Sequence, residues 1–98
     1  MDKEAFERYL LKKYSNKRIV SDALSRCKRV EKSLDLDLDR EYVRDRCGKL
    51  IDILEYTKEE EDLGTPLPKG IIIKGNYVNG MASLRNAVRR YVEYCESR

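Results

Sequence analysis

The sequence predicts an all-α fold, a small bundle of four helices with one long loop before the last helix. Apolar residues recur three and four positions apart in three long segments, which is the period of one helix face. The only strand-like run, residues 71–73, has no partner strand. The stretch LGTPLPKG, residues 63–70, holds both prolines of the chain and predicts a linker. With 98 residues, we expect a single helical domain spanning residues 1–98.

The first two helices follow from this period. Residues 2–14 form the first, with Phe6, Tyr9 and Leu10 as its apolar edge. Residues 18–34 form the second, whose apolar stripe continues through five positions: Val20, Leu24, Cys27, Val30 and Leu34. Such a stripe predicts that one side of each helix is buried and the other is exposed to solvent.

The segment LDLDLD follows the second helix. Its three aspartates have the spacing at which an EF-hand calcium loop begins: Asp35, Asp37 and Asp39. The sixth position of that loop holds Arg40 instead of glycine, however, and the twelfth holds Arg46 instead of glutamate. We therefore reject a calcium site. We expect Leu36 and Leu38 to pack against the core and Asp39 to cap the next helix.

A third helix is expected over residues 40–56. Its buried stripe consists of Tyr42 or Val43, Cys47, Leu50, Ile51 and Leu54. Gly48 inside it costs about 1 kcal/mol relative to alanine and would permit a close helix crossing. The run KEEED, residues 58–62, is expected to be a solvated charge run. The isoleucines of GIIIKGN are expected to pack as an apolar loop against the helices.

The last helix is expected over residues 79–97, with Asn79 as its cap. Its apolar stripe consists of Met81, Leu84, Val88, Tyr91, Val92 and Cys95. Its other face carries a hydroxyl, an amide and three guanidinium groups: Ser83, Arg85, Asn86, Arg89 and Arg90. Because Arg85 and Arg89 are four positions apart, we expect both to project from the exposed side.

Composition excludes several classes of protein. No apolar run is long enough for a transmembrane helix, and the charged N-terminus does not resemble a signal peptide, so we expect a cytoplasmic protein. The three cysteines lie on three different apolar stripes, which predicts buried, unpaired thiols. There is no histidine, and no glycine-rich phosphate motif occurs. We therefore expect no metal site, no cofactor and no catalytic activity.

Charge is distributed unevenly along the chain, although the net charge is only +3. Residues 17–34 hold six bases and two acids, and residues 63–98 hold the same numbers, so each segment sums to +4. Residues 35–62 hold five bases and eleven acids and sum to −6. Two basic segments therefore flank an acidic one, and a basic helix face favours a negatively charged partner.

The order of these features resembles a known family. The stretches FERYLLKKYSNKRIVSDALSRCKRVEKSL, DLDLDREYVRDRCGKLIDILEY and NGMASLRNAVRRYVEYC resemble the core-binding, SAM-like N-terminal domain of tyrosine recombinases and phage integrases. The most specific part is the last helix, which matches at Ser83, Leu84, Arg85, Val88, Tyr91, Val92 and Cys95. The resemblance covers most of the chain, from Phe6 to Cys95.

The resemblance implies an orthogonal bundle of four or five helices that forms half of a clamp around duplex DNA. It also implies that the second and fourth helices face the major groove. Carried over by position, the DNA-binding residues are Lys17, Arg18, Ser21, Ser25 and Lys28, together with Ser83, Arg85, Asn86, Arg89 and Arg90. The chain departs from the family pattern in its longer, more acidic loop over residues 57–76. It also lacks the catalytic set, which would reside in a domain C-terminal to this one.

The sequence thus leaves two hypotheses of function. The first is a non-catalytic DNA-binding domain, the targeting module of a longer DNA-processing protein such as a recombinase or nuclease, with duplex DNA as its partner. The alternative is a helical protein–protein interaction or structural domain with no nucleic-acid role. Neither hypothesis involves a membrane. Salt-dependent binding to duplex DNA separates the two hypotheses, since phosphate contacts release counterions.

Overall fold

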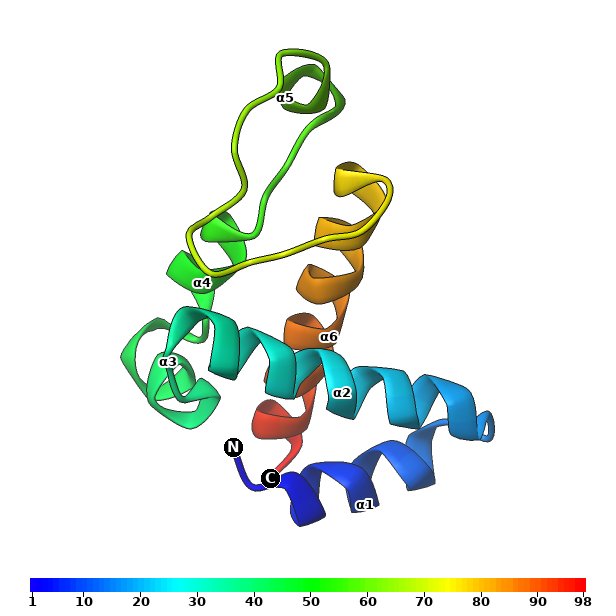
Figure 1. Cartoon of the computed structure of the whole chain (residues 1–98). Coiled ribbons are helices and arrows are strands. Elements are labelled where there is room, and N and C mark those ends of the chain that lie inside the picture. Colours follow the sequence, from blue (N-terminus) through cyan, green and yellow to red (C-terminus); the bar gives the residue numbers. More distant parts are fainter.

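The computed structural model describes all residues from 1 to 98, and all of its regular secondary structure is helical, which confirms the predicted all-α class. It contains six helices rather than four or five (Figure 1): α1 (Lys3–Lys13), α2 (Lys17–Leu34), α3 (Leu38–Asp45), α4 (Gly48–Ile53), α5 (Lys58–Asp62) and α6 (Tyr77–Ser97). The last helix, α6, packs against each of the other five. None of the helices is both long and apolar enough to cross a membrane.

The first two helices lie where the sequence predicts them. The Asp2 side chain accepts a hydrogen bond of 3.1 Å from the Ala5 backbone N–H and caps α1. The Asn16 side chain accepts one of 2.8 Å from the Arg18 N–H and caps α2, which begins one residue earlier than predicted. The five predicted stripe residues of α2 are buried or half-buried, so its opposite face is open to solvent.

The prediction of one continuous third helix is wrong, because the chain breaks at Arg46 and Cys47. Both residues have left-handed backbone angles, with φ of 57° and 63°. The Cys47 N–H bonds to the Glu41 carbonyl oxygen at 3.1 Å, a closure typical of a helix C-terminus. Gly48 begins α4 instead of lying inside a helix, and no neighbouring helix approaches it closely.

The predicted cap and stripe of the third helix need two smaller corrections. Asp37, not Asp39, caps α3, since its side chain accepts a hydrogen bond of 3.0 Å from the Asp39 N–H. Leu38 is buried and Leu36 is half-buried against the core, as predicted. Of the two stripe alternatives Tyr42 is half-buried, whereas Val43 is 82% exposed and lies outside the core.

The charge run KEEED forms the short helix α5, and none of its residues is buried, in agreement with the expected solvated charge run. A capping box closes its start, because the Thr57 hydroxyl accepts from the Glu60 N–H while the Glu60 carboxylate accepts from the Thr57 N–H. The Glu61 carboxylate accepts from the backbone N–H groups of Tyr77 and Val78 at 3.0 and 3.3 Å. The acidic run therefore holds the start of α6, where the helix dipole favours negative charge.

Residues 70–75, which we call the strap, cross beside α2 before the chain enters α6 (Figure 1). Ile71 is buried, Ile73 is half-buried and Ile72 is 72% exposed, so alternate side chains face the core. The prediction of an apolar loop packed on the helices is confirmed. The helix that follows begins at Tyr77 with Asn76 as its cap, so Asn79 lies inside α6 and is not the predicted cap.

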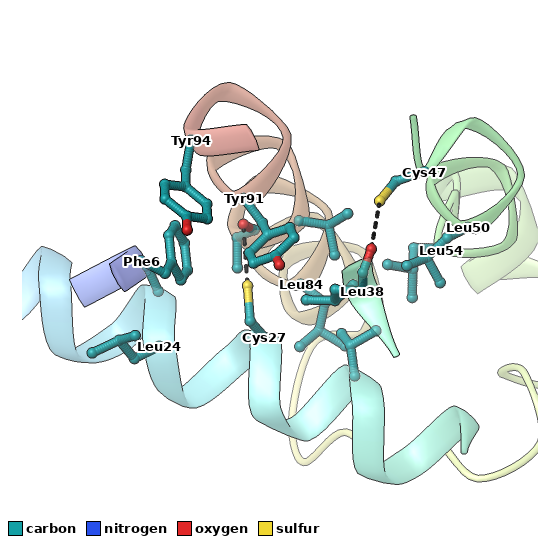
Figure 2. Packing of buried hydrophobic residues seen from close by; sticks show 14 of the residues in the cluster. Phe6, Leu24, Cys27, Leu38, Cys47, Leu50, Leu54, Leu84, Tyr91 and Tyr94 are labelled. Carbon is teal, nitrogen blue, oxygen red and sulfur yellow. Dashed lines mark hydrogen bonds between the residues drawn. The ribbon is translucent and has the colours of Figure 1, made fainter. Parts of the chain in front are cut away.

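One apolar core of twenty buried residues joins the helices, and it contains no buried polar or charged residue. Figure 2 shows Cys27 pointing from α2 toward α6, where its Sγ donates a 3.3 Å hydrogen bond to the Ala87 carbonyl oxygen. The Tyr91 hydroxyl of α6 donates to the Asp39 carboxylate of α3. All three cysteines are buried and unpaired, which confirms the prediction for the thiols.

Candidate nucleic-acid interface

The exposed face of α2 carries positive charge that no acid of the domain neutralises. Its two acids are both engaged within the domain. Asp22 pairs with Arg26 at 3.8 Å, and Glu31 accepts a hydrogen bond of 2.9 Å from the Leu38 N–H. Five bases of α2 are exposed and form no ion pair. One of them, Arg29, donates a hydrogen bond to the Ile72 carbonyl oxygen. The other four are Lys17, Arg18, Lys28 and Lys32. We call these four residues, with Ser21 and Ser25 between them, the basic face.

A shallow groove of about 570 Å³ runs between α1 and α2 along one side of this face. On the α2 side it is lined by two lysines, two serines and two apolar residues, namely Lys17, Lys28, Ser21, Ser25, Val20 and Leu24. From α1 it receives Lys3, Glu7 and Leu11. Four of the five predicted DNA-binding residues on α2 thus lie together. The fifth, Arg18, is exposed in the first turn of the same helix, outside the groove.

The five predicted residues of α6 do not form one surface. Ser83 and Arg90 lie on the flank toward α1 and α2, since Ser83 shares a crevice with Arg26 and the Arg90 guanidinium lies 5.3 Å from the Tyr14 ring centroid. Asn86 and Arg89 are exposed, on the outer side of the helix. These positions differ because successive residues of a helix are rotated by about 100° around its axis.

Arg85 lies on the opposite flank of α6, toward α4. Its Nη1 donates a hydrogen bond of 2.9 Å to the carbonyl oxygen of Leu54, the C-cap residue of α4. The side chain is half-buried, so the prediction that it is exposed beside Arg89 is wrong. Its position follows from the packing of α4 on α6. A guanidinium at a helix C-terminus satisfies a carbonyl that has no partner within the helix.

The outer faces of α2 and α6 point in different directions. The two helices meet through their buried faces, at which the Cys27 thiol reaches the Ala87 carbonyl oxygen. Their opposite faces therefore cannot both lie against one side of a single duplex. The ten predicted residues are brought together only in part. The five of α2 share one side of that helix, and the five of α6 are spread over its two flanks and its outer side.

Residues beyond the predicted set extend the positive surface. Lys3 from α1 enters the groove, and Lys74 from the strap lies in a second hollow with Arg26 and Arg29. The charge surplus of residues 17–34 already indicates Arg26 and Arg29. Nothing in the sequence places Lys3 or Lys74 beside them, since they come from segments far apart in the chain.

Two neighbours of the interface have shifted pKa values. The Tyr9 hydroxyl, followed by the Glu93 carboxylate at 3.1 Å, raises the pKa of Lys13, which contacts both groups at the α1–α6 junction. Burial raises the pKa of the Cys27 thiol, which lies beneath the basic face, to about 12. Both groups keep their protons at neutral pH. No cluster of three or more His, Cys, Asp or Glu side chains is arranged to hold a metal ion.

Comparison with known proteins does not assign the chain to a family. No protein-family model, curated protein or solved structure matches it.

Proposed function

We propose that this chain is a non-catalytic DNA-binding domain that contacts duplex DNA through the basic face of α2 and the adjoining α1–α2 groove. It would serve as the targeting module of a DNA-processing protein such as a recombinase or nuclease, whose catalytic residues lie on another domain. The observation that supports this most is the charge of the basic face, because its four bases have no acidic partner within the domain.

The residue types on this face suit a nucleic-acid backbone. Lysine and arginine bind phosphate oxygens, and serine hydroxyls donate to them at close range. Ser21 and Ser25 lie between Lys17 and Lys28 along one side of the groove, so two hydroxyl groups are flanked by two ammonium groups there. The groove is also shallow and open, which suits a rod-like polyanion better than a small molecule.

The proposed contact centres on α2 and its groove with α1, and it does not include the outer face of α6. Ser83 shares a hollow with Arg26 and Arg29 of α2, and Arg90 lies against the Tyr14 ring, whereas Asn86 and Arg89 are exposed on the outer side of α6. Most of the recognition is therefore expected to be through phosphates. Phosphate contacts position a protein on DNA but carry no sequence information directly, so the domain is expected to tolerate many DNA sequences.

Fluorescence anisotropy of a labelled duplex, titrated at about 50 and 200 mM salt, tests the proposal. Affinity of the wild type should fall steeply between the two concentrations. The double variant Lys17→Gln/Lys28→Gln should bind more weakly and show a salt slope reduced by about two units. The matched control is Lys12→Gln/Lys49→Gln, which removes equal charge from exposed lysines that lie outside the groove and form no ion pair.

Two outcomes would contradict the proposal. The first is equal loss of affinity in both double variants, which would indicate attraction to net charge without a defined surface. The second is absence of binding by the wild type at the lower salt concentration. That result would favour the alternative, a helical protein-interaction domain with no nucleic-acid role.

A further inference from the structure

A second basic hollow lies on the other flank of α2, where this helix, the strap and α6 meet. It encloses about 440 Å³ and is lined by Arg26 and Arg29 of α2, by Ile72, Ile73 and Lys74 of the strap, and by Gly80, Ser83 and Leu84 of α6. We call it the strap crevice. Its three cationic side chains come from two segments that are more than forty residues apart in the sequence, and only the fold brings them together.

The strap is held rigidly enough to place Lys74. Gly70 has a φ of +94° and lies so close to α2 that a Cβ there would be 2.1 Å from the Ser33 carbonyl oxygen. Ile73 packs against Gly80, where a Cβ would be 2.5 Å from its Cγ2. Gly75, at a φ of +89°, then turns the chain toward α6. Lys74 therefore directly follows a residue that packs against α6.

The charges of the crevice are only partly compensated. Asp22 pairs with Arg26 at 3.8 Å, and the two side chains are each about 40% exposed. Such an exposed pair is weak. Arg29 donates to the Ile72 carbonyl oxygen, and its remaining guanidinium N–H groups stay free for another acceptor. Lys74 forms no ion pair.

The remaining lining suits an oxyanion. The Ser83 hydroxyl donates to the Asn79 carbonyl oxygen at 3.0 Å, and a hydroxyl can rotate toward a nearer acceptor. Ile72, Ile73 and Leu84 form an apolar wall beside the charged groups of the crevice. A water molecule takes up about 30 Å³ in the liquid, so the crevice has room for a phosphate group and its attendant waters.

We propose that the strap crevice binds a phosphate group of the DNA backbone, with Arg26 and Lys74 as its main ligands and Arg29 and Ser83 in support. This inference rests on the proposed function. It adds a fixed anchoring point on the flank of α2 opposite the α1–α2 groove, so the DNA backbone would be contacted on both sides of the basic face. Arginine is suited to such a site because its planar guanidinium binds two phosphate oxygens at once.

Two titrations of the same protein test the inference. In the first, backbone amide resonances are followed by NMR while inorganic phosphate replaces chloride at constant ionic strength. The resonances of residues 72–74 and Ser83 should shift in the wild type and in the Lys12→Gln/Lys49→Gln control, but not in Arg26→Gln/Lys74→Gln. In the second, the labelled duplex is titrated at two salt concentrations, and the crevice variant should lose about two units of salt slope.

Each outcome separates this inference from the proposed function. If phosphate does not shift the crevice resonances, or shifts them equally in the crevice variant, the inference is overturned even though DNA binding through the α1–α2 groove persists. If phosphate binds in the crevice but the crevice variant binds DNA as tightly as the control, the site serves a free phosphate compound and its assignment to DNA is overturned. The inference is supported if the crevice variant, but not the control, loses both the phosphate-induced resonance shifts and about two units of salt slope in DNA binding.

Discussion

The Arg85 guanidinium donates a hydrogen bond of 2.9 Å to the Leu54 carbonyl oxygen, and this contact ties the C-terminal end of α4 to the middle of α6. Arg89 lies one helical turn further along, yet it is exposed and forms no ion pair or hydrogen bond within the domain. Two arginines that the sequence places on one side of a helix thus have different surroundings. The first contributes to the fold, and the second is a solvated surface residue.

Arg85→Ala should therefore lower the free energy of unfolding, whereas Arg89→Ala should not. Removing a hydrogen bond to a charged group costs about 1.5–3 kcal/mol, and a surface substitution usually stays within about 0.5 kcal/mol. Urea denaturation followed by circular dichroism measures both variants. Equal stability of the two would show that the contact with Leu54 contributes nothing. Arg89→Ala should also leave DNA affinity unchanged, since its side chain faces away from the basic face.

The strap provides a second matched pair of substitutions. Gly70 and Gly64 both have positive φ, +94° and +71°, but only Gly70 has a close neighbour, the Ser33 carbonyl oxygen. Gly64→Ala should cost about 1–2 kcal/mol through backbone strain alone. Gly70→Ala should cost about 1–3 kcal/mol more, because a methyl group would be forced against fixed backbone. Thermal denaturation of both variants gives the difference, and similar melting temperatures would contradict the close approach of the strap to α2.

Glu61 and Glu59 offer a third pair within the acidic run. Glu61 accepts two backbone hydrogen bonds at the start of α6, whereas Glu59 accepts none from α6 and is exposed. Glu61→Ala should destabilise the domain by about 0.5–2 kcal/mol, the range for loss of a helix cap. Glu59→Ala should change stability by less than about 0.5 kcal/mol. Hydrogen exchange of the first amides of α6 should also become faster in Glu61→Ala only; unchanged exchange would argue against this capping role.

The buried thiols make stability depend on pH in the alkaline range. Burial, followed by the nearby Glu31, raises the pKa of Cys27 to about 12, and burial raises that of Cys47 to about 12, from an ordinary value of 9.0. As pH rises above 9, the unfolded chain loses these protons while the folded chain keeps them. The unfolded state then binds fewer protons, so the stability that is fully present below pH 9 falls progressively between pH 9 and 12.

Melting temperatures measured between pH 8 and 10.5 check this dependence, with Cys27→Ala as the comparison. The variant should be less stable at pH 8 because it leaves a small cavity beside Ala87. Its stability should fall less steeply with pH, by up to about 1.4 kcal/mol per pH unit, since one thiol is missing. Parallel curves for the two proteins would show that the pKa of Cys27 is the same in the folded and unfolded chains.

Local patterns allow α1, α2 and most of α6 to be predicted from the sequence, because each keeps a 3.6-residue apolar period and has an aspartate or asparagine near its start. The break at Arg46 and Cys47 carries no such signal. Neither residue favours a left-handed backbone, and the nearby glycine, Gly48, lies one position beyond the turn. Tertiary contacts decide it, since Cys47 and Leu38 must both reach the core within one short segment.

The candidate interface is predictable only on α2. Its basic face follows from the helix period and from local charge, and both can be read from residues that are close together in the sequence. The flanks of α6 are not predictable in this way, because whether Arg85 meets solvent or Leu54 depends on where α4 packs. The strap crevice is even harder to predict from the sequence. Lys74 and Arg26 line the same hollow only because Gly70, Gly75 and Ile73 set the course of the strap.

The contact of α6 with all five other helices has a consequence for how the protein is made. Synthesis on the ribosome proceeds from the N-terminus, so the apolar faces of α2 and α3 leave the exit tunnel before Tyr77–Ser97 has emerged to cover them. At that stage Val30 and Leu38 of the nascent chain would be exposed to solvent, because the core that buries them has not yet formed. The domain is therefore expected to fold in one cooperative step after its last helix has emerged, and shielding of the chain by a chaperone would matter most just before that moment.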